Sequence, residues 1–152
     1  VSGNTDFTTE GILDTTTTLG GAEAGAFDQA ITKTDPAMVM MSLATYQSID
    51  PNNPAVFSST IIDGHIRNAL KYTGVVISDS MSAEALSSYD VSQLGVKLVE
   101  AGGDMSCIGQ TDYVKPIVDG LNERAKSDPA FASKVTAAAT RVMALKIKMG
   151  LA

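Results

Sequence analysis

The sequence has no tryptophan, one cysteine and one histidine, and each scarcity excludes a class of site. A lone Cys107 excludes an internal disulfide and a cysteine-based zinc cluster, and a lone His65 excludes a histidine-rich metal site.

Lysine and arginine number 11 against 17 acidic residues, which gives a net charge of −6. Because nucleic-acid binding needs a basic surface, no nucleic-acid partner is expected. No apolar run approaches the roughly 20 residues that a membrane span needs.

The sequence does contain short apolar runs that alternate with longer stretches of helical periodicity. With 44% hydrophobic residues over 152 positions, it can form a substantial core. Apolar runs predict buried strands at 37–43, 74–78 and 102–109. Apolar residues at helical spacing predict helices over 20–34, 58–72, 91–100, 114–125 and 131–149. This order is typical of an α/β protein with a parallel sheet.

Three parallel strands do not make a complete fold, because they leave two open edges and a poorly covered face. A (β/α)₈ TIM-type barrel takes about 250 residues, and this chain has the length and element order of its last three strand–helix units. We therefore interpret residues 1–152 as a single partial domain, the C-terminal part of such a barrel. Its N-terminal half is expected to be absent or on another chain, and the first residue, valine rather than methionine, agrees with this interpretation.

The most informative stretch is Gly-Val-Val-Ile-Ser-Asp-Ser at 74–80. Its apolar part predicts a strand that is buried on both faces, and polar residues begin only at Ser78. In α/β proteins, ligands and catalytic groups gather at the carboxyl ends of strands, so Asp79 is a candidate reactive group. The alternative is that Asp79 caps a helix that residues 81–86 predict.

The segment Gly74–Glu84 resembles the nucleophile segment of glycoside hydrolase family 3, in particular its bacterial β-N-acetylglucosaminidase branch. Further matches follow in the order of that family: Val39-Met40-Met41-Ser42, Tyr46, Ile49-Asp50, Pro54-Ala55, Ile66-Arg67, Ala101-Gly102-Gly103-Asp104-Met105, Arg141-Val142 and Leu145-Lys146. The resemblance spans nearly the whole chain. It implies that the chain supplies the sixth, seventh and eighth strands of the family's catalytic barrel.

The resemblance implies a retaining β-glycosidase in which Asp79 forms a covalent glycosyl-enzyme. The chemistry agrees, because the nucleophile must be an ionised carboxylate that is held rigidly, as at the end of a buried strand. The implied substrate is a carbohydrate with a terminal β-linked sugar, foremost N-acetylglucosamine from cell-wall or chitin fragments. No metal or other cofactor is called for, since two carboxyl groups and water suffice. The cell envelope or the extracellular space is favoured over the cytoplasm, because relatives that act on wall fragments include exported ones.

Residues 1–19 lack periodicity and are interpreted as a catalytic-type loop. In the acetylglucosaminidase branch, this loop carries an acid/base histidine and, two residues earlier, an aspartate. Here Asp6 stands in the place of the histidine and Asn4 in that of the aspartate. The resemblance therefore makes Asp6 a candidate acid/base and Asn4 a candidate substrate-binding residue. The alternatives are an ordinary Asx-turn role for Asp6, an acid from elsewhere, or loss of hydrolysis.

Tyr46 and Met81 lie beside predicted strand ends and are candidate sugar-binding residues, with plain loop packing as the alternative for both. Ser80, Ala83 and Leu43 depart from residues that are common in the branch, so the sugar specificity stays open. Two other functions stay open beside hydrolysis. One is a catalytically impaired, glycosidase-like carbohydrate-binding protein, and the other is a receiver-type phosphoacceptor domain, against which the lack of an early acidic cluster counts.

Overall fold

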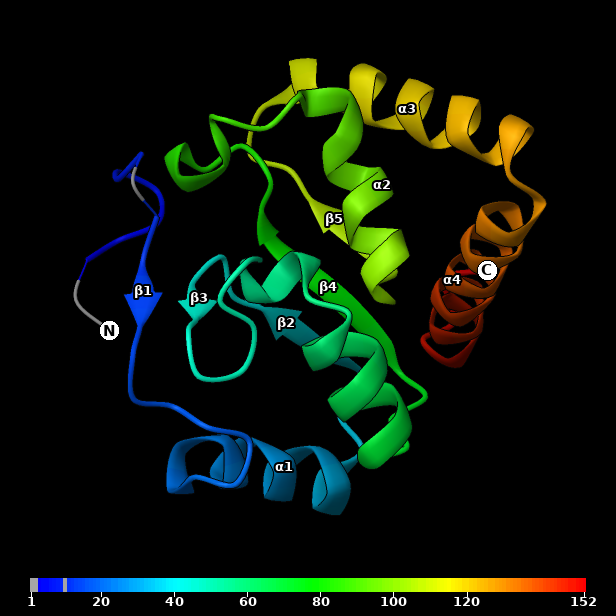
Figure 1. The fold of residues 1–152 in the computed structure, drawn as a ribbon. Coiled ribbons are helices and arrows are strands. Elements are labelled where there is room, and N and C mark those ends of the chain that lie inside the picture. Colours follow the sequence, from blue (N-terminus) through cyan, green and yellow to red (C-terminus); the bar gives the residue numbers. More distant parts are fainter. Residues whose placement is uncertain (1–2, 10) are drawn as a thin grey trace.

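The computed structural model describes residues 3–9 and 11–152, and a parallel sheet lies at its centre (Figure 1). The sheet consists of β2 (Met38–Met41), β4 (Val75–Ser80) and β5 (Met105–Cys107), in the order β2-β4-β5. Both pairings are parallel, and helices connect the strands, as parallel neighbours require. The predicted α/β class is therefore confirmed. Of the predicted loop 1–19, residues 1, 2 and 10 lie outside the described residues.

Helices occupy the predicted regions with shifted ends: α1 (Ala22–Thr34), η2 (Thr60–Ala69), α2 (Val91–Ala101), α3 (Val114–Ser127) and α4 (Pro129–Lys148). Short 3₁₀ turns add η1 (Ala55–Phe57), η3 (Glu84–Leu86) and η4 (Thr111–Tyr113). The carboxylates of Asp90 and Asp128 accept backbone N–H groups at the starts of α2 and α4, which fixes these boundaries. Among the helices that the structure describes, none is long and apolar enough to cross a membrane.

Helix η2 is a π-helix, and it is shorter than the predicted helix over 58–72. The amide of Leu70 donates to the carbonyl of His65 at 2.9 Å, five residues back. At its start, Ser58 Oγ accepts a hydrogen bond of 3.2 Å from the amide of Ile61. The helix ends early because Lys71 adopts a left-handed conformation, with φ of 58°.

A second, two-stranded sheet was not predicted. Strand β1 (Leu13–Asp14) pairs in parallel with β3 (Thr45–Tyr46), and β1 lies inside the predicted loop over 1–19. Two-residue strands are too short to show a hydrophobic period, so the pattern of the sequence could not reveal them. The pairing fixes the N-terminal segment against the loop that follows β2.

The two faces of the central sheet differ in burial. Val76 and Ser78 of β4 are fully buried, and Figure 1 shows η2 and α2 in front of the sheet. The core cluster on this side includes Ile62, Ile66, Leu94 and Leu98 together with Val76. On the other face, Met38 and Met40 of β2 are 42% and 65% exposed, although Val75 of β4, which is paired with Met38, is buried.

At the amino end of β5, Asp104 joins three elements through buried charges. Its side chain is fully buried and accepts hydrogen bonds from Arg67 of η2, from Arg141 of α4 at 2.8 Å and from the amide of Val76 at 2.8 Å. Burial lowers the pKa of Arg67, although the charge of Asp104 opposes this shift. The cluster therefore fixes two helices against one end of the sheet.

Candidate active site

Asp79 lies near the carboxyl end of β4, the central strand of the sheet. Its side chain is partly buried, and its Oδ1 accepts a hydrogen bond of 2.8 Å from the amide of Ser80. The register of β4 against β5 shifts between Ile77 and Ser80, so the strand is irregular at this residue. Such irregularities occur next to active sites, where they redirect a side chain.

The alternative role of Asp79 as a helix cap is wrong. Residues 81–86 do not form the predicted helix, since only the 3₁₀ turn Glu84–Leu86 follows the strand. The residue at the N-cap of this turn is Ala83, and the next helix, α2, is capped by Asp90. The position of Asp79 is therefore not explained by helix capping.

Serine hydroxyls hold the segment around Asp79 against the end of β5. Ser78 Oγ accepts from the amide of Cys107 at 2.9 Å, and Ser82 Oγ accepts from the amide of Gly109 at 3.1 Å. The hydroxyls of Ser80 and Ser82 also lie 3.1 Å apart, within hydrogen-bond distance. The strand end that carries Asp79 is thus held by several hydrogen bonds, and the lone Cys107 is exposed beside it.

The loop at residues 3–9 contacts the segment that follows Asp79. The amide of Ala85 donates to the carbonyl of Thr5 at 3.0 Å, and Figure 1 shows the two segments side by side. Within the loop, Asn4 Oδ1 accepts from the amide of Asp6 at 2.9 Å, which is an Asx turn. The Asx residue is therefore Asn4, while the carboxylate of Asp6 is exposed.

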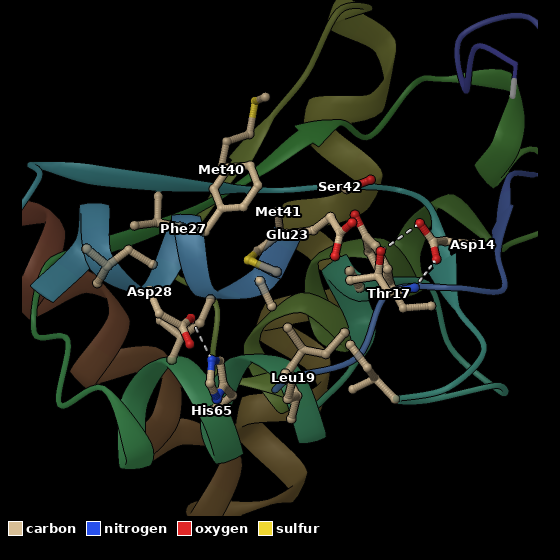
Figure 2. A pocket seen from close by; sticks show the side chains of 18 residues that line it. Asp14, Thr17, Leu19, Glu23, Phe27, Asp28, Met40, Met41, Ser42 and His65 are labelled. Carbon is tan, nitrogen blue, oxygen red and sulfur yellow. Dashed lines mark hydrogen bonds and ion pairs between the residues drawn. The ribbon is translucent and has the colours of Figure 1, made fainter. Parts of the chain in front are cut away.

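Tyr46 and Met81 lie in different surroundings. Met81 is fully buried in the core cluster, so its burial supports the packing alternative. Tyr46 of β3 is partly buried and lines a cavity of about 260 Å³ between α1, β2 and η2 (Figure 2). Asp79 and Asp6 are not among the residues that line this cavity.

Asp14 and the pair of Asp28 with His65 are further polar groups in this cavity. The amides of Thr17 and Thr16 donate to Asp14 at 2.7 and 2.9 Å and lower the pKa of its carboxyl. His65 Nε2 lies 2.8 Å from Asp28 Oδ1, so His65 joins η2 to α1. Asp14 was not predicted as a site residue, although Asp followed by Thr two and three residues later is typical of an Asx turn.

The fold and the position of Asp79 together are typical of one class of protein, the α/β enzymes. Parallel strands carry a carboxylate at the carboxyl end of the central strand, and a polar loop packs beside it. This is the arrangement by which α/β enzymes expose reactive groups at strand ends.

The chain belongs to glycosyl hydrolase family 3, because the model of the glycosyl hydrolase family 3 N terminal domain matches residues 4–145. This match confirms the resemblance that begins with the segment around Asp79. It gives no support to the phosphoacceptor alternative.

Solved structures agree with the family. The chain is 35% identical to a β-N-acetylhexosaminidase from Beutenbergia cavernae, with a TM-score of 0.87. The similarity covers 95% of this chain and 43% of that chain. A family 3 β-N-acetylglucosaminidase from a Paenibacillus species is 26% identical with a TM-score of 0.81, over 92% of this chain and 27% of that one. The chain thus spans less than half the length of these relatives.

A sequence relative is a secreted glycosyl hydrolase from Arthroderma benhamiae. It is 36% identical over 69 residues, which is 45% of this chain and 20% of that protein. Here too, the chain corresponds to a limited part of a longer protein.

Proposed function

We propose that this chain is the C-terminal part of the catalytic barrel of a retaining β-glycosidase, with Asp79 as the nucleophile. The position of Asp79 at the carboxyl end of the central parallel strand carries this proposal. Hydrogen bonds of Ser78 and Ser82 to the end of β5 support it, since a nucleophile must be held in place while it attacks.

In the proposed reaction, the Asp79 carboxylate attacks the anomeric carbon as the glycosidic bond breaks. A general acid protonates the leaving oxygen, and the sugar stays on Asp79 as an ester. The same group then takes a proton from water, which attacks the anomeric carbon and frees Asp79 with net retention of configuration. In retaining glycosidases the two carboxyl groups stand about 5–5.5 Å apart.

Asp6 is the proposed acid/base, and Asn4 a proposed substrate contact. The hydrogen bond between Thr5 and Ala85 supports this proposal, because it holds their loop beside the segment after Asp79. Asp6 is exposed in this structure, so the role requires the loop to close over a bound sugar. Tyr46 stays a candidate sugar contact beside the end of β2.

The proposed substrate is a carbohydrate that ends in β-linked N-acetylglucosamine. Its support is the similarity to enzymes that are described as a β-N-acetylhexosaminidase and a β-N-acetylglucosaminidase.

We also propose that the protein acts outside the cytoplasm, which the secreted Arthroderma benhamiae relative favours. The N-terminal half of the barrel is its proposed partner, because the relatives are more than twice as long as this chain.

The proposal is tested by Asp79→Asn in the complete protein, that is, with the whole barrel present. Hydrolysis of a chromogenic β-N-acetylglucosaminide should fall at least about a thousandfold, because the variant has no nucleophile. The matched control is Asp119→Asn on α3, which removes an exposed carboxylate far along the chain and should leave turnover unchanged. A 2-fluoro-glycoside should add its sugar to the peptide that contains Asp79. Unchanged turnover in Asp79→Asn would refute the role.

A second candidate function is a carbohydrate-binding protein that has lost hydrolysis. The observation that favours it is Asp6, an exposed carboxylate where the branch has a histidine. Calorimetry on the complete protein distinguishes the two functions. Binding of N-acetylglucosamine without a covalent adduct from the 2-fluoro-glycoside would favour the binding protein.

A further inference from the structure

The strand that carries Asp79 is regular on one side and irregular on the other. Against β2, each paired residue of β4 faces one residue in an unbroken register. Against β5, the three steps of Ile77–Ser80 match the two steps of Met105–Cys107. Strand β4 therefore has one extra residue at this point, which is a β-bulge, and Asp79 lies inside it.

One residue of β5 binds the bulge through both of its backbone polar groups. The amide of Cys107 donates to Ser78 Oγ at 2.9 Å. The carbonyl of Cys107 accepts from the amide of Met81 at 2.8 Å. Ser78 directly precedes Asp79, and Met81 follows it by two residues. The backbone of Cys107 thus fixes the chain on both sides of Asp79.

Only one of these two bonds depends on a side chain. The bond from Met81 to Cys107 joins two backbone groups, so it does not depend on which residues stand there. In a parallel sheet, an amide of one strand normally donates to a backbone carbonyl of the next. At Cys107 a serine hydroxyl takes the place of that carbonyl. Ser78 is therefore the residue through which the sequence sets the bulge.

The burial of Ser78 excludes a direct contact with a substrate. Its side chain is 0% exposed, whereas that of its neighbour Asp79 is only partly buried. A buried hydroxyl requires a hydrogen-bond partner, and the amide of Cys107 is the partner here. Any effect of Ser78 on a reaction is therefore exerted through the position of Asp79.

The carboxylate of Asp79 depends on the bulge for its orientation. Its Oδ1 accepts a hydrogen bond of 2.8 Å from the amide of Ser80, which is the last residue of the irregular segment. A slip of a strand by one residue turns the following side chains to the opposite face of the sheet. Loss of the bulge would thus move both the side chain of Asp79 and the amide that orients it.

We propose that Ser78 is a positioning residue of the reaction: its hydroxyl maintains the bulge that directs the Asp79 carboxylate toward the sugar. This inference rests on the proposed function, since it takes Asp79 as the nucleophile. Without the hydroxyl, the amide of Cys107 loses its acceptor and pairs with a backbone carbonyl of β4 instead. That pairing moves Asp79, so attack on the anomeric carbon slows while binding of the sugar is preserved.

The test compares Ser78→Ala with Ser58→Ala in the complete protein, that is, with the whole barrel present. Ser58 is the matched control because it is also 0% exposed and its Oγ also accepts from a backbone amide, that of Ile61 at 3.2 Å, but at the start of η2. Each variant is treated with a 2-fluoro-glycoside at several concentrations, and mass spectrometry follows the covalent adduct over time. The maximal rate of adduct formation is thereby separated from the concentration that gives half of this rate.

In Ser78→Ala, the maximal rate should fall about tenfold to a hundredfold, whereas the half-saturating concentration should change less than about twofold. In Ser58→Ala, the maximal rate should change less than about twofold, although the variant also loses a buried hydrogen bond. Ser78→Thr keeps a hydroxyl at this position and should restore the maximal rate to within about threefold of the parent. Thermal unfolding of each variant checks that it is folded at the assay temperature.

A normal maximal rate in Ser78→Ala, an equal loss in Ser58→Ala, or no recovery in Ser78→Thr would each overturn the positioning role. Asp79→Asn is measured in the same assay. If it forms no adduct while Ser78→Ala reacts at the parent rate, the role of Ser78 is wrong and the proposed function stands. If Asp79→Asn forms the adduct normally, the proposed function itself is wrong. The two failures are thus distinguishable.

Discussion

Asp50 organises the loop between β3 and η2. Its carboxylate accepts hydrogen bonds from the hydroxyl of Ser58 at 2.7 Å, the side-chain amide of Asn53 at 3.2 Å and the backbone amide of Asn52 at 3.1 Å. Burial raises the pKa of Asp50, but these hydrogen bonds outweigh burial and leave the pKa below its ordinary value of 3.8. The ionised form of Asp50 therefore stabilises the folded loop.

This lowered pKa predicts a pH dependence of stability. The folded state binds fewer protons at Asp50 than the unfolded state, so the stabilisation is complete well above pH 3.8 and is lost as the pH falls through the folded pKa. Asp50→Asn should lower the free energy of unfolding at pH 6 and make it fall less steeply below pH 4. Urea titrations from pH 3 to 6 measure both effects.

Asp112→Asn, in the exposed turn η4, is the control for this measurement. It should leave the stability and its pH dependence close to those of the parent chain. Equal acid sensitivity of Asp50→Asn and the parent would contradict the role of Asp50.

Residue roles of this kind were only partly predictable from the sequence. Asp79 was identified because it lies two residues after the apolar run Val75–Ile77, which is a local signal. The partners of Asp104, by contrast, lie 37 residues away on either side, at Arg67 and Arg141. No periodicity encodes such a pairing, since it depends on which elements become neighbours in space.

At the scale of elements, α2 and α3 pack closely through glycines. A Cβ on Gly120 of α3 would overlap the backbone carbonyl oxygen of Ser92 in α2, and one on Gly95 would lie 2.7 Å from Ile117 Cγ2. The contact at Gly120 needs glycine because the backbone of Ser92 cannot move aside as a flexible side chain can.

Gly120→Ala should therefore destabilise the protein by about 2 kcal/mol or more, although alanine favours helix by about 1 kcal/mol. Gly25→Ala in α1 is the matched control, because its Cβ would have no neighbour within 4 Å. That variant should be neutral or up to about 1 kcal/mol more stable. Thermal and urea unfolding measure both, and a neutral Gly120→Ala would contradict the close packing of α2 and α3.

Element positions followed from local patterns, whereas several boundaries did not. The strand predicted over 102–109 contains only Met105–Cys107, because Gly102 ends α2 with φ of 104°. The pairing of β1 with β3 escaped prediction because its partners are 32 residues apart and two residues long. Boundaries and short pairings are set by contacts that the chain makes only after folding.

For the molecule as a whole, stability should be unevenly distributed. Helix α2 buries Leu94, Gly95, Val96, Leu98, Val99 and Ala101, whereas α1 buries Ile31 alone. Local opening is easiest where few apolar side chains are buried. In the isolated chain, amides of α1 should exchange hydrogen at least about tenfold faster than those of α2. Mass spectrometry resolves the two helices, and equal rates would contradict this distribution.

By itself, the sequence determined the α/β class, the approximate places of strands and helices, and Asp79 as a candidate reactive group, because apolar runs, helical periods and strand-end polarity are local properties. The tertiary structure decided which residues meet. It removed the helix-cap role of Asp79, placed the loop of Asp6 against Ala85, and revealed the cavity between α1 and β2. These are contacts between distant segments, and their energies exist only once the chain has brought those segments together.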